Sequence, residues 1–318
     1  MAQLILVGIG AGAATALLFA SVASGSLISV LLFYLAPLPI LIAALGWSHW
    51  AALIAALTAS LGLAAVFGGF FFVAFLLGIG LPAWWLGYLA LLARPAGPEP
   101  DQLEWYPAGH LVVWTAIIAG LLVIAGMLNF GTDEESFRAA LRSGIERMLR
   151  VQARAGSESR LPDSTRLVDF LLLALPPAAA VLTTLTMAIN LWLAGRIVKV
   201  SGRLRRPPPD LSAMTFPTYA PGLLAAAVAG SFLPGMIGIA AGVLSASMLM
   251  AYAFLGFAVL HAITRGMSSR MLVLGGVYAA VMVFGWPVLV LTLIGLADTA
   301  IDIRGRFAQK RGPPSIHT

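Results

Sequence analysis

The first 93 residues of the chain contain no Lys, Arg, Asp or Glu, and Arg94 carries the first formal charge. So long an uncharged apolar stretch suits the hydrocarbon of a bilayer, where helices satisfy their backbone hydrogen bonds internally. Over all 318 residues, 60% are hydrophobic and 10% are charged, whereas soluble domains carry about 25% charged residues. The whole chain is therefore not a soluble enzyme, a disordered protein or a nucleic-acid-binding module.

Apolar stretches of about 20 residues, the length that crosses a bilayer, follow one another along the chain. They predict an all-α, polytopic transmembrane helix bundle of about ten spans, with eight or nine spans as alternatives. The expected spans are residues 4–22, 27–45, 50–66, 70–92, 110–128 and 167–193, two within 217–262 and two within 271–300. Helix breaks are expected at four prolines: Pro37, Pro177, Pro234 and Pro287.

The same pattern divides the chain into five expected segments. They are a four-helix hairpin membrane block (1–93), a polar linker with the fifth span (94–130), an extracytoplasmic amphipathic insert (131–166), the remaining membrane spans (167–303) and a basic cytoplasmic tail (304–318).

The net charge of +6 comes from basic residues that cluster beside apolar stretches. In a membrane protein such clusters mark cytoplasmic loops. Two segments are predicted to be cytoplasmic on this basis: the loop with Arg265 and Arg270, and the tail from Arg304 onward. Because both lie on the same side of the membrane, an even number of spans should separate them. We therefore expect both termini in the cytoplasm and no nucleic-acid partner.

The insert should form an amphipathic helix over about 133–155. Thr132 and Glu135 have the spacing of a capping box. Apolar residues recur at helical spacing: Phe137, Leu141, Ile145, Met148 and Val151. Two roles are open, a lid on the membrane surface over a site or simple packing on the bundle or the lipid headgroups.

Two sets of residues are candidates for function. The first is a row of small residues on the first span that allows close helix packing, within the bundle or with a partner: Gly8, Gly12, Ala16 and Ala20. The second contains polar groups within or near spans, where such groups are costly and therefore candidates for a polar cavity or an ion site: Asp169, Asn190, His261, Asp298 and Asp302.

Familiar catalytic motifs are missing. The chain has no GxxxxGK[ST] phosphate-binding loop, no HExxH and no cysteine. We therefore expect neither an enzyme nor a cofactor or metal site. Asp298 and Asp302 do resemble the end of the phosphatidyl-alcohol transferase motif, which leaves a membrane-embedded, metal-dependent transferase as a minor alternative.

The uncharged four-helix start, the polar insert and the closing Gly295-Leu296-Ala297-Asp298-x-x-x-Asp302-x-Arg304 together resemble the YybS-like family, bacterial polytopic membrane proteins with domain of unknown function 2232. That family is distantly similar to the substrate-capture subunits of energy-coupling-factor transporters. The resemblance implies a multi-pass protein of the bacterial inner (plasma) membrane. It also implies that the small-residue face of the first helix docks on a membrane coupling protein with an ATPase.

The leading functional hypothesis is an integral inner-membrane protein that binds or transports a small solute and depends on a partner for energy. The lipid bilayer is its first partner, and the identity of the solute stays open. The alternative is an assembly or scaffold protein of the cell envelope, with the insert and the basic loop around 196–206 as docking surfaces.

Overall fold

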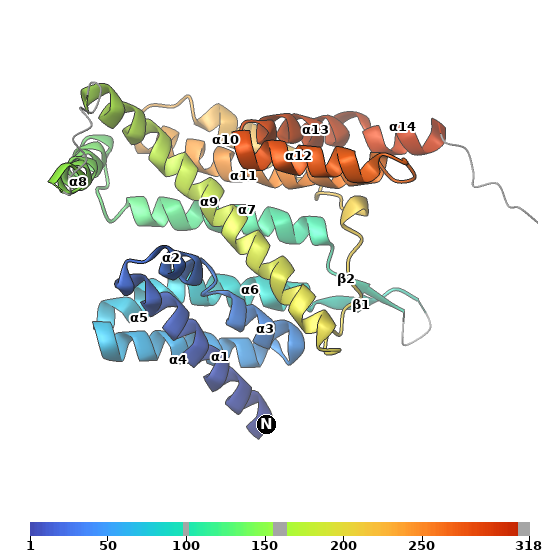
Figure 1. Ribbon diagram of the computed structural model, residues 1–318, viewed down its shortest axis with the longest axis horizontal. Helices are drawn as coiled ribbons and strands as arrows, with labels where there is room; N and C mark the ends of the chain where they lie inside the picture. The colour runs from blue at the N-terminus through green and yellow to red at the C-terminus, as the bar shows by residue number, and fades with distance from the viewer. Residues whose placement is uncertain (98–101, 155–163, 311–318) are drawn as a thin grey trace, which may run out of the picture. The chain divides into compact units, whose positions relative to one another are not determined.

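The computed structural model describes residues 1–97, 102–154 and 164–310. These residues are almost entirely helical (Figure 1). The first part of the chain contains α1 (Ala2–Ala20), η1 (Ser21–Ser24), α2 (Leu27–Tyr34), α3 (Leu38–Gly46), α4 (His49–Phe67), α5 (Gly69–Phe75), η2 (Leu76–Gly80), α6 (Leu81–Ala90), β1 (Ala93–Pro95) and β2 (Leu103–Trp105). The second part contains α7 (Ala108–Met127), α8 (Glu134–Arg154), α9 (Ser164–Val200), η3 (Leu211–Ala213), α10 (Ala220–Gly230), α11 (Gly235–Ile263), α12 (Arg270–Phe284), α13 (Pro287–Ile301) and α14 (Ile303–Lys310).

Seven helical stretches among the described residues are long and apolar enough to cross a membrane. They are Ala2–Ser24, Leu27–Gly46, His49–Phe67, Gly69–Ala90, Ala108–Met127, Thr165–Val200 and Gly235–Ile263. The all-α membrane bundle is thereby confirmed. The other three expected spans are shorter apolar helices, α10, α12 and α13. At 1.5 Å per residue they measure about 16, 22 and 22 Å against a hydrocarbon core of about 30 Å, so the count of ten stays a prediction.

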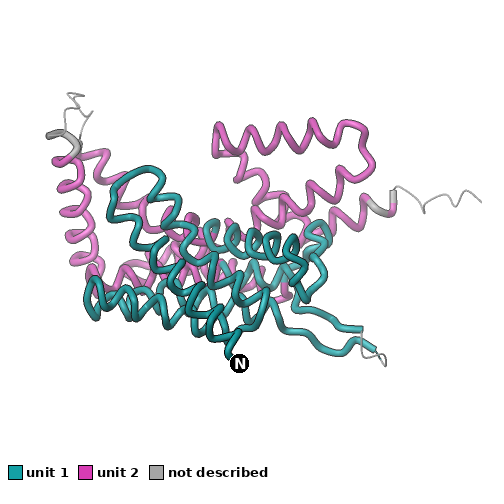
Figure 2. The backbone as a smooth tube through the Cα atoms, turned by 60° about the horizontal axis from the view of Figure 1, so that its bottom comes forward, with its two compact units in different colours: residues 1–115, 185–216 teal, residues 116–184, 217–318 magenta. Residues whose placement is uncertain are grey.

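The chain forms two compact units (Figure 2). Unit 1 consists of residues 1–115 and 185–216, and unit 2 of residues 116–184 and 217–318. Two of the three boundaries fall inside α7 and α9, and the third lies before α10, so each unit combines segments that are distant in sequence. The five linear segments expected from the sequence describe order along the chain and stay a prediction.

The small-residue row of α1 packs inside unit 1. A Cβ added at Gly8 would lie 2.6 Å from the Ile54 side chain, and one at Gly12 would lie 2.6 Å from the Ala55 carbonyl oxygen and the Thr58 side chain. Both glycines therefore bring α1 into backbone contact with α4, as small residues do between membrane helices. Further along α1, Ala16 is partly buried and close to Gly62 of α4; Ala20 is also partly buried.

Helix continuity at the four prolines differs from site to site. Pro37 lies between α2 and α3, Pro234 directly precedes α11, and Pro287 is the first residue of α13. The break expected at Pro177 is wrong, because α9 continues as one helix of 37 residues through both Pro176 and Pro177. Proline removes a backbone donor without ending a membrane helix when the rest of the helix stays packed and paired.

The segment after α6, expected as a polar linker, contains a small antiparallel hairpin. Ala93 pairs with Trp105 and Pro95 with Leu103. Between them, the exposed side chains of Arg94 and Glu104 form an ion pair at 2.7 Å, which lowers the pKa of the Glu104 carboxyl through its hydrogen bond and charge. The prolines at 98 and 100 lie outside the described residues.

In unit 2, α8 is the expected amphipathic helix, but its cap differs from the expected one. Asp133 caps it, since its Oδ1 accepts a hydrogen bond from the Ser136 N–H at 2.9 Å. Hydrogen bonds from Ser136 lower the pKa of the Asp133 carboxyl. The capping box expected from Thr132 and Glu135 is therefore one residue out of register. The rest of the insert, 155–163, lies outside the described residues.

Helix α13 packs directly against α11. A Cβ on Gly256 would collide with the Leu291 carbonyl oxygen, and one on Gly295 would collide with the Tyr252 carbonyl oxygen. Thr292 Oγ1 also donates to the Leu249 carbonyl oxygen at 3.3 Å. One glycine on each helix thus contacts the backbone of the other helix. This close contact positions the corner between α13 and α14.

Candidate functional site

The second span of unit 1 is interrupted between α2 and α3. In a continuous helix the Leu38 N–H would bond to the Tyr34 carbonyl, but here it bonds to the Leu35 carbonyl at 3.0 Å. Pro37 contributes no N–H and disfavours a helical conformation at the residue before it. The interruption therefore leaves the Tyr34 carbonyl without its usual backbone donor.

Asn190 on α9 supplies the missing donor. Its Nδ2 donates to the Tyr34 carbonyl at 2.9 Å and to the Thr186 carbonyl of its own helix at 2.8 Å. Both partners are pure acceptors, so the amide nitrogen must face them. We call the Tyr34 carbonyl, Pro37 and Asn190 the α2–α3 break site.

The other end of the same amide is unsatisfied. Asn190 is 1% exposed, and its Oδ1 accepts no hydrogen bond from any residue that the structure describes. A buried amide oxygen without a donor costs about 1–3 kcal/mol. Buried polar groups in folded proteins are nearly always paired with protein, water or a ligand. The break site therefore contains a buried acceptor that no described protein group satisfies.

A second span of unit 1 is irregular as well. Between α5 and α6 the five residues of η2 form a π-helical turn, and Pro82 stands at the start of α6. Single π-turns inside helices occur often at functional sites. Nearby, a Cβ on Gly80 would meet the Ala56 side chain at 3.1 Å, so α4 closely contacts the end of this turn.

The closing motif of the chain forms a corner between α13 and α14. Asp298 Oδ1 accepts from the Arg304 backbone N–H at 3.0 Å, and Oδ2 accepts from Arg304 Nε at 2.9 Å. The Asp298 side chain is 4% exposed and that of Arg304 is 16% exposed. Asp302 ends α13 in a left-handed conformation at φ 48°, and its Oδ1 accepts from the Gly305 N–H.

In this corner both aspartates have partners within the chain. Both oxygens of Asp298 accept donors from Arg304, and the Asp302 carboxylate closes the turn that starts α14. Within the described parts of the chain, no group of three or more His, Asp or Glu side chains is arranged to hold a metal ion. The two carboxylates thus act as a structural clamp in this conformation.

The remaining two candidates lie in separate surroundings within unit 2. Asp169 is exposed at the start of α9 and forms an ion pair with Arg142 of α8. His261 is half-buried on α11, where its Nδ1 donates to the Phe257 carbonyl at 2.9 Å and its ring packs edge-on against Tyr278. Asp169 and His261 thus contact different helices, and the polar cavity expected from the sequence stays a prediction.

One buried charge was not singled out from the sequence. Arg206 donates to the carbonyls of Ala90 at 3.3 Å and Tyr106 at 2.9 Å, and burial lowers the pKa of its guanidinium. It connects the end of α6 to the segment before α7. Its neighbour Arg203 lies 4.7 Å from the Trp47 ring centroid. Arg203 and Arg206 both lie in the basic loop around 196–206. The sequence alone did not indicate these contacts, because basic loops usually only orient a protein in the membrane.

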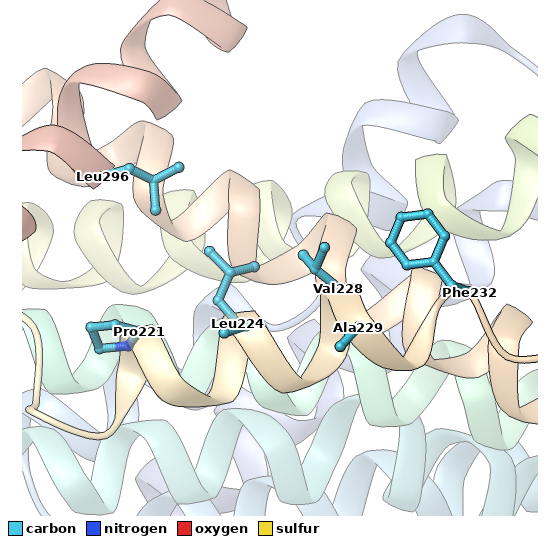
Figure 3. Close-up of a pocket in the computed structure, with 7 residues that line it drawn as sticks. Pro221, Leu224, Val228, Ala229, Phe232 and Leu296 are labelled. Carbon is cyan, nitrogen blue, oxygen red and sulfur yellow. The ribbon is translucent and has the colours of Figure 1, made fainter.

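Unit 2 also has an open apolar pocket of about 660 Å³ along α10 (Figure 3). Its lining residues are Pro221, Leu224, Ala225, Val228, Ala229, Phe232 and Leu296. Figure 3 shows the α10 side chains along one helix, with Leu296 reaching in from α13. None of these seven side chains is polar, whereas a solute site needs a few polar groups to orient its ligand.

Residues 13–299 match the family model described as "Predicted membrane protein (DUF2232)". The chain belongs to this family. The DUF2232 match includes the α2–α3 break site and Asp298, and it ends before Asp302 and Arg304. Membership of the YybS-like family, expected from the sequence, is confirmed; the similarity to capture subunits stays a prediction. No curated protein matches the DUF2232 chain, and no solved structure matches it.

Proposed function

We propose that this DUF2232 membrane protein binds a small solute that donates hydrogen bonds, with Asn190 Oδ1 at the α2–α3 break as its acceptor. The observation that carries the proposal is the unpartnered oxygen of a side chain that is 1% exposed. The amide is held in place by two carbonyls, so its free oxygen is oriented before a ligand arrives. Such pre-organisation reduces the cost of binding.

The position of this acceptor supports a solute-binding role. Interrupted membrane helices with freed backbone carbonyls form the binding sites of many secondary transporters. Here the interruption at Pro37 is closed by a polar side chain from α9, a helix that follows it by more than a hundred residues. Binding of a solute next to Asn190 would thus depend on the position of α9 relative to the interrupted span of α2 and α3. That coupling is what a transport cycle requires.

We further propose that a partner supplies the energy for movement of the solute. The resemblance to capture subunits assigns the docking of a coupling protein to the small-residue face of α1. That face is covered by α4, which contacts Gly8 and Gly12, so a coupling protein would dock elsewhere. Location in a bacterial inner membrane with both termini cytoplasmic is part of the same proposal.

The test is purification in mild detergent from the native host, followed by mass spectrometry of bound small molecules. The wild type should carry one dominant compound with N–H or O–H donors. Asn190→Gln keeps the amide but displaces its oxygen by one methylene, and we expect it to lose most of the compound.

Asn129→Ala is the matched control, because Asn129 is an exposed residue that caps the end of α7 through the Ala125 carbonyl. The control should retain the compound. Equal amounts of compound in the wild type and Asn190→Gln, or no compound in any of the three proteins, would contradict the proposal. Melting curves of each protein separate loss of binding from loss of fold.

A further inference from the structure

The apolar face of α8 is covered along only part of its length. Phe137 is 2% exposed and packs with Met127, Ala180 and Val243. One turn and two turns later, Leu141 and Ile145 contact the start of α9, where Val168 and Leu172 complete a small apolar cluster. This part of the helix is thus fixed to unit 2.

The apolar face of α8 continues beyond the residues that pack against the rest of unit 2. Met148 follows Phe137 by eleven residues, which places it within about 20° of the same helix face. Nevertheless Met148 is 63% exposed, and Val151, one turn further, is 62% exposed. A large apolar side chain exposed at the same helix angle as a fully covered one indicates a surface with another occupant.

The charges beside these two residues indicate the chemistry of that occupant. Arg147 and Arg150 flank Met148 and Val151, and both arginines are exposed. Glu146 is the acidic residue closest to them on the helix, and it is only partly exposed. The combination of exposed apolar and cationic side chains suits a partner that is apolar inside and anionic at its surface.

Chain connectivity determines where α8 lies. Six residues separate it from the end of α7 at Met127, and its packing partner α9 begins the next candidate membrane span near Thr165. The ion pair between Arg142 and Asp169 further fastens α8 to the first turns of α9. Helix α8 thus follows the end of one candidate membrane span and packs beside the start of the next, where we expect the boundary between hydrocarbon and water.

We propose that Arg147, Met148, Arg150 and Val151 bind the headgroup region of anionic phospholipids in the surrounding bilayer, with the arginines on the phosphates. This surface is independent of the α2–α3 break site. The interaction would hold the end of α8 on the membrane and so fix the orientation of the segment between α7 and α9.

A single-cysteine experiment on the full chain tests this, because the sequence has no native cysteine. Val151→Cys carries an environment-sensitive fluorophore in liposomes of phosphatidylcholine with or without phosphatidylglycerol, together with a lipid quencher at the headgroup boundary. We expect quenching to increase in liposomes with phosphatidylglycerol. Adding Arg147→Gln and Arg150→Gln should abolish that increase.

Ala139→Cys is the matched control. Ala139 is exposed and lies about 120° around the helix from Val151 and about 180° from Met148, so the label there should be unquenched in both membranes. Identical quenching of Val151→Cys with and without phosphatidylglycerol overturns the proposal. An increase that persists in the double arginine variant overturns it as well. Because both arginines are exposed, the melting temperature in detergent should be unchanged by their replacement.

Discussion

Two polar side chains, Asn190 and Arg206, bond to backbone carbonyls where helices end or are interrupted. Asn190 bonds to Tyr34, which is 156 residues earlier in the chain, and Arg206 bonds to Ala90, 116 residues earlier. Sequence patterns reveal relations between residues three or four positions apart. They therefore identified Asn190 as a polar residue within a span, but they could not identify the Tyr34 carbonyl as its hydrogen-bond acceptor. From the sequence, Arg206 was only one member of the basic loop around 196–206, although its burial and its two carbonyl bonds make it part of the fold.

The Asp298–Arg304 pair should stabilise the end of α13. Removing one partner of a buried ion pair leaves an uncompensated charge, at a cost of roughly 3–5 kcal/mol. We therefore expect Arg304→Gln to lower the melting temperature in detergent clearly, measured by intrinsic fluorescence. Arg94→Gln breaks an ion pair whose side chains are both exposed and should change little. Equal melting temperatures for the two variants would refute the clamp.

At the scale of elements, hydropathy located the apolar stretches well, because burial in lipid demands about 20 uncharged residues wherever a helix crosses. Helix interruptions were harder to predict. Proline alone did not decide between the break at Pro37 and the continuous helix at Pro177, since neighbouring helices determine whether freed backbone groups find partners. The π-turn at 76–80 has no proline inside it and gave no signal in the apolar pattern.

The contact between α1 and α4 gives a prediction with a control on the same helix. Gly12→Leu should separate the two helices, because a Cβ there already meets the Ala55 carbonyl at 2.6 Å. Overpacking of this kind costs about 1–3 kcal/mol. Gly10→Leu should be tolerated, since nothing lies within 4 Å of a Cβ at that position. Thermal unfolding and the yield of monodisperse protein measure both. If the two variants are equally stable, α4 is not the partner of this face.

At the scale of the whole molecule, two compact units share the helices α7 and α9, and membership of the DUF2232 family covers nearly the whole chain. The linear order of spans was predictable from composition. The division into units was not, because it depends on which distant segments pack together. The number of crossings rests on α10, α12 and α13, which are shorter than the other apolar helices.

Cysteine accessibility tests whether α10 crosses the membrane. Ten spans with cytoplasmic termini place Ser201 and Ser268 on the cytoplasmic side and Ala139 on the other side. In intact cells, a membrane-impermeant maleimide should therefore label Ala139→Cys but neither Ser201→Cys nor Ser268→Cys, all three of which are exposed positions. If Ser268→Cys is labelled and Ser201→Cys is not, then an odd number of crossings separates them and α10 does not span.

Whether Asn190 Oδ1 binds a ligand can be seen in an electron cryomicroscopy map of the protein purified with its bound small molecules. We expect non-protein density larger than a water molecule, with a donor atom about 3 Å from Oδ1. A protein donor against Oδ1, or a single ordered water bonded only to protein, would contradict it.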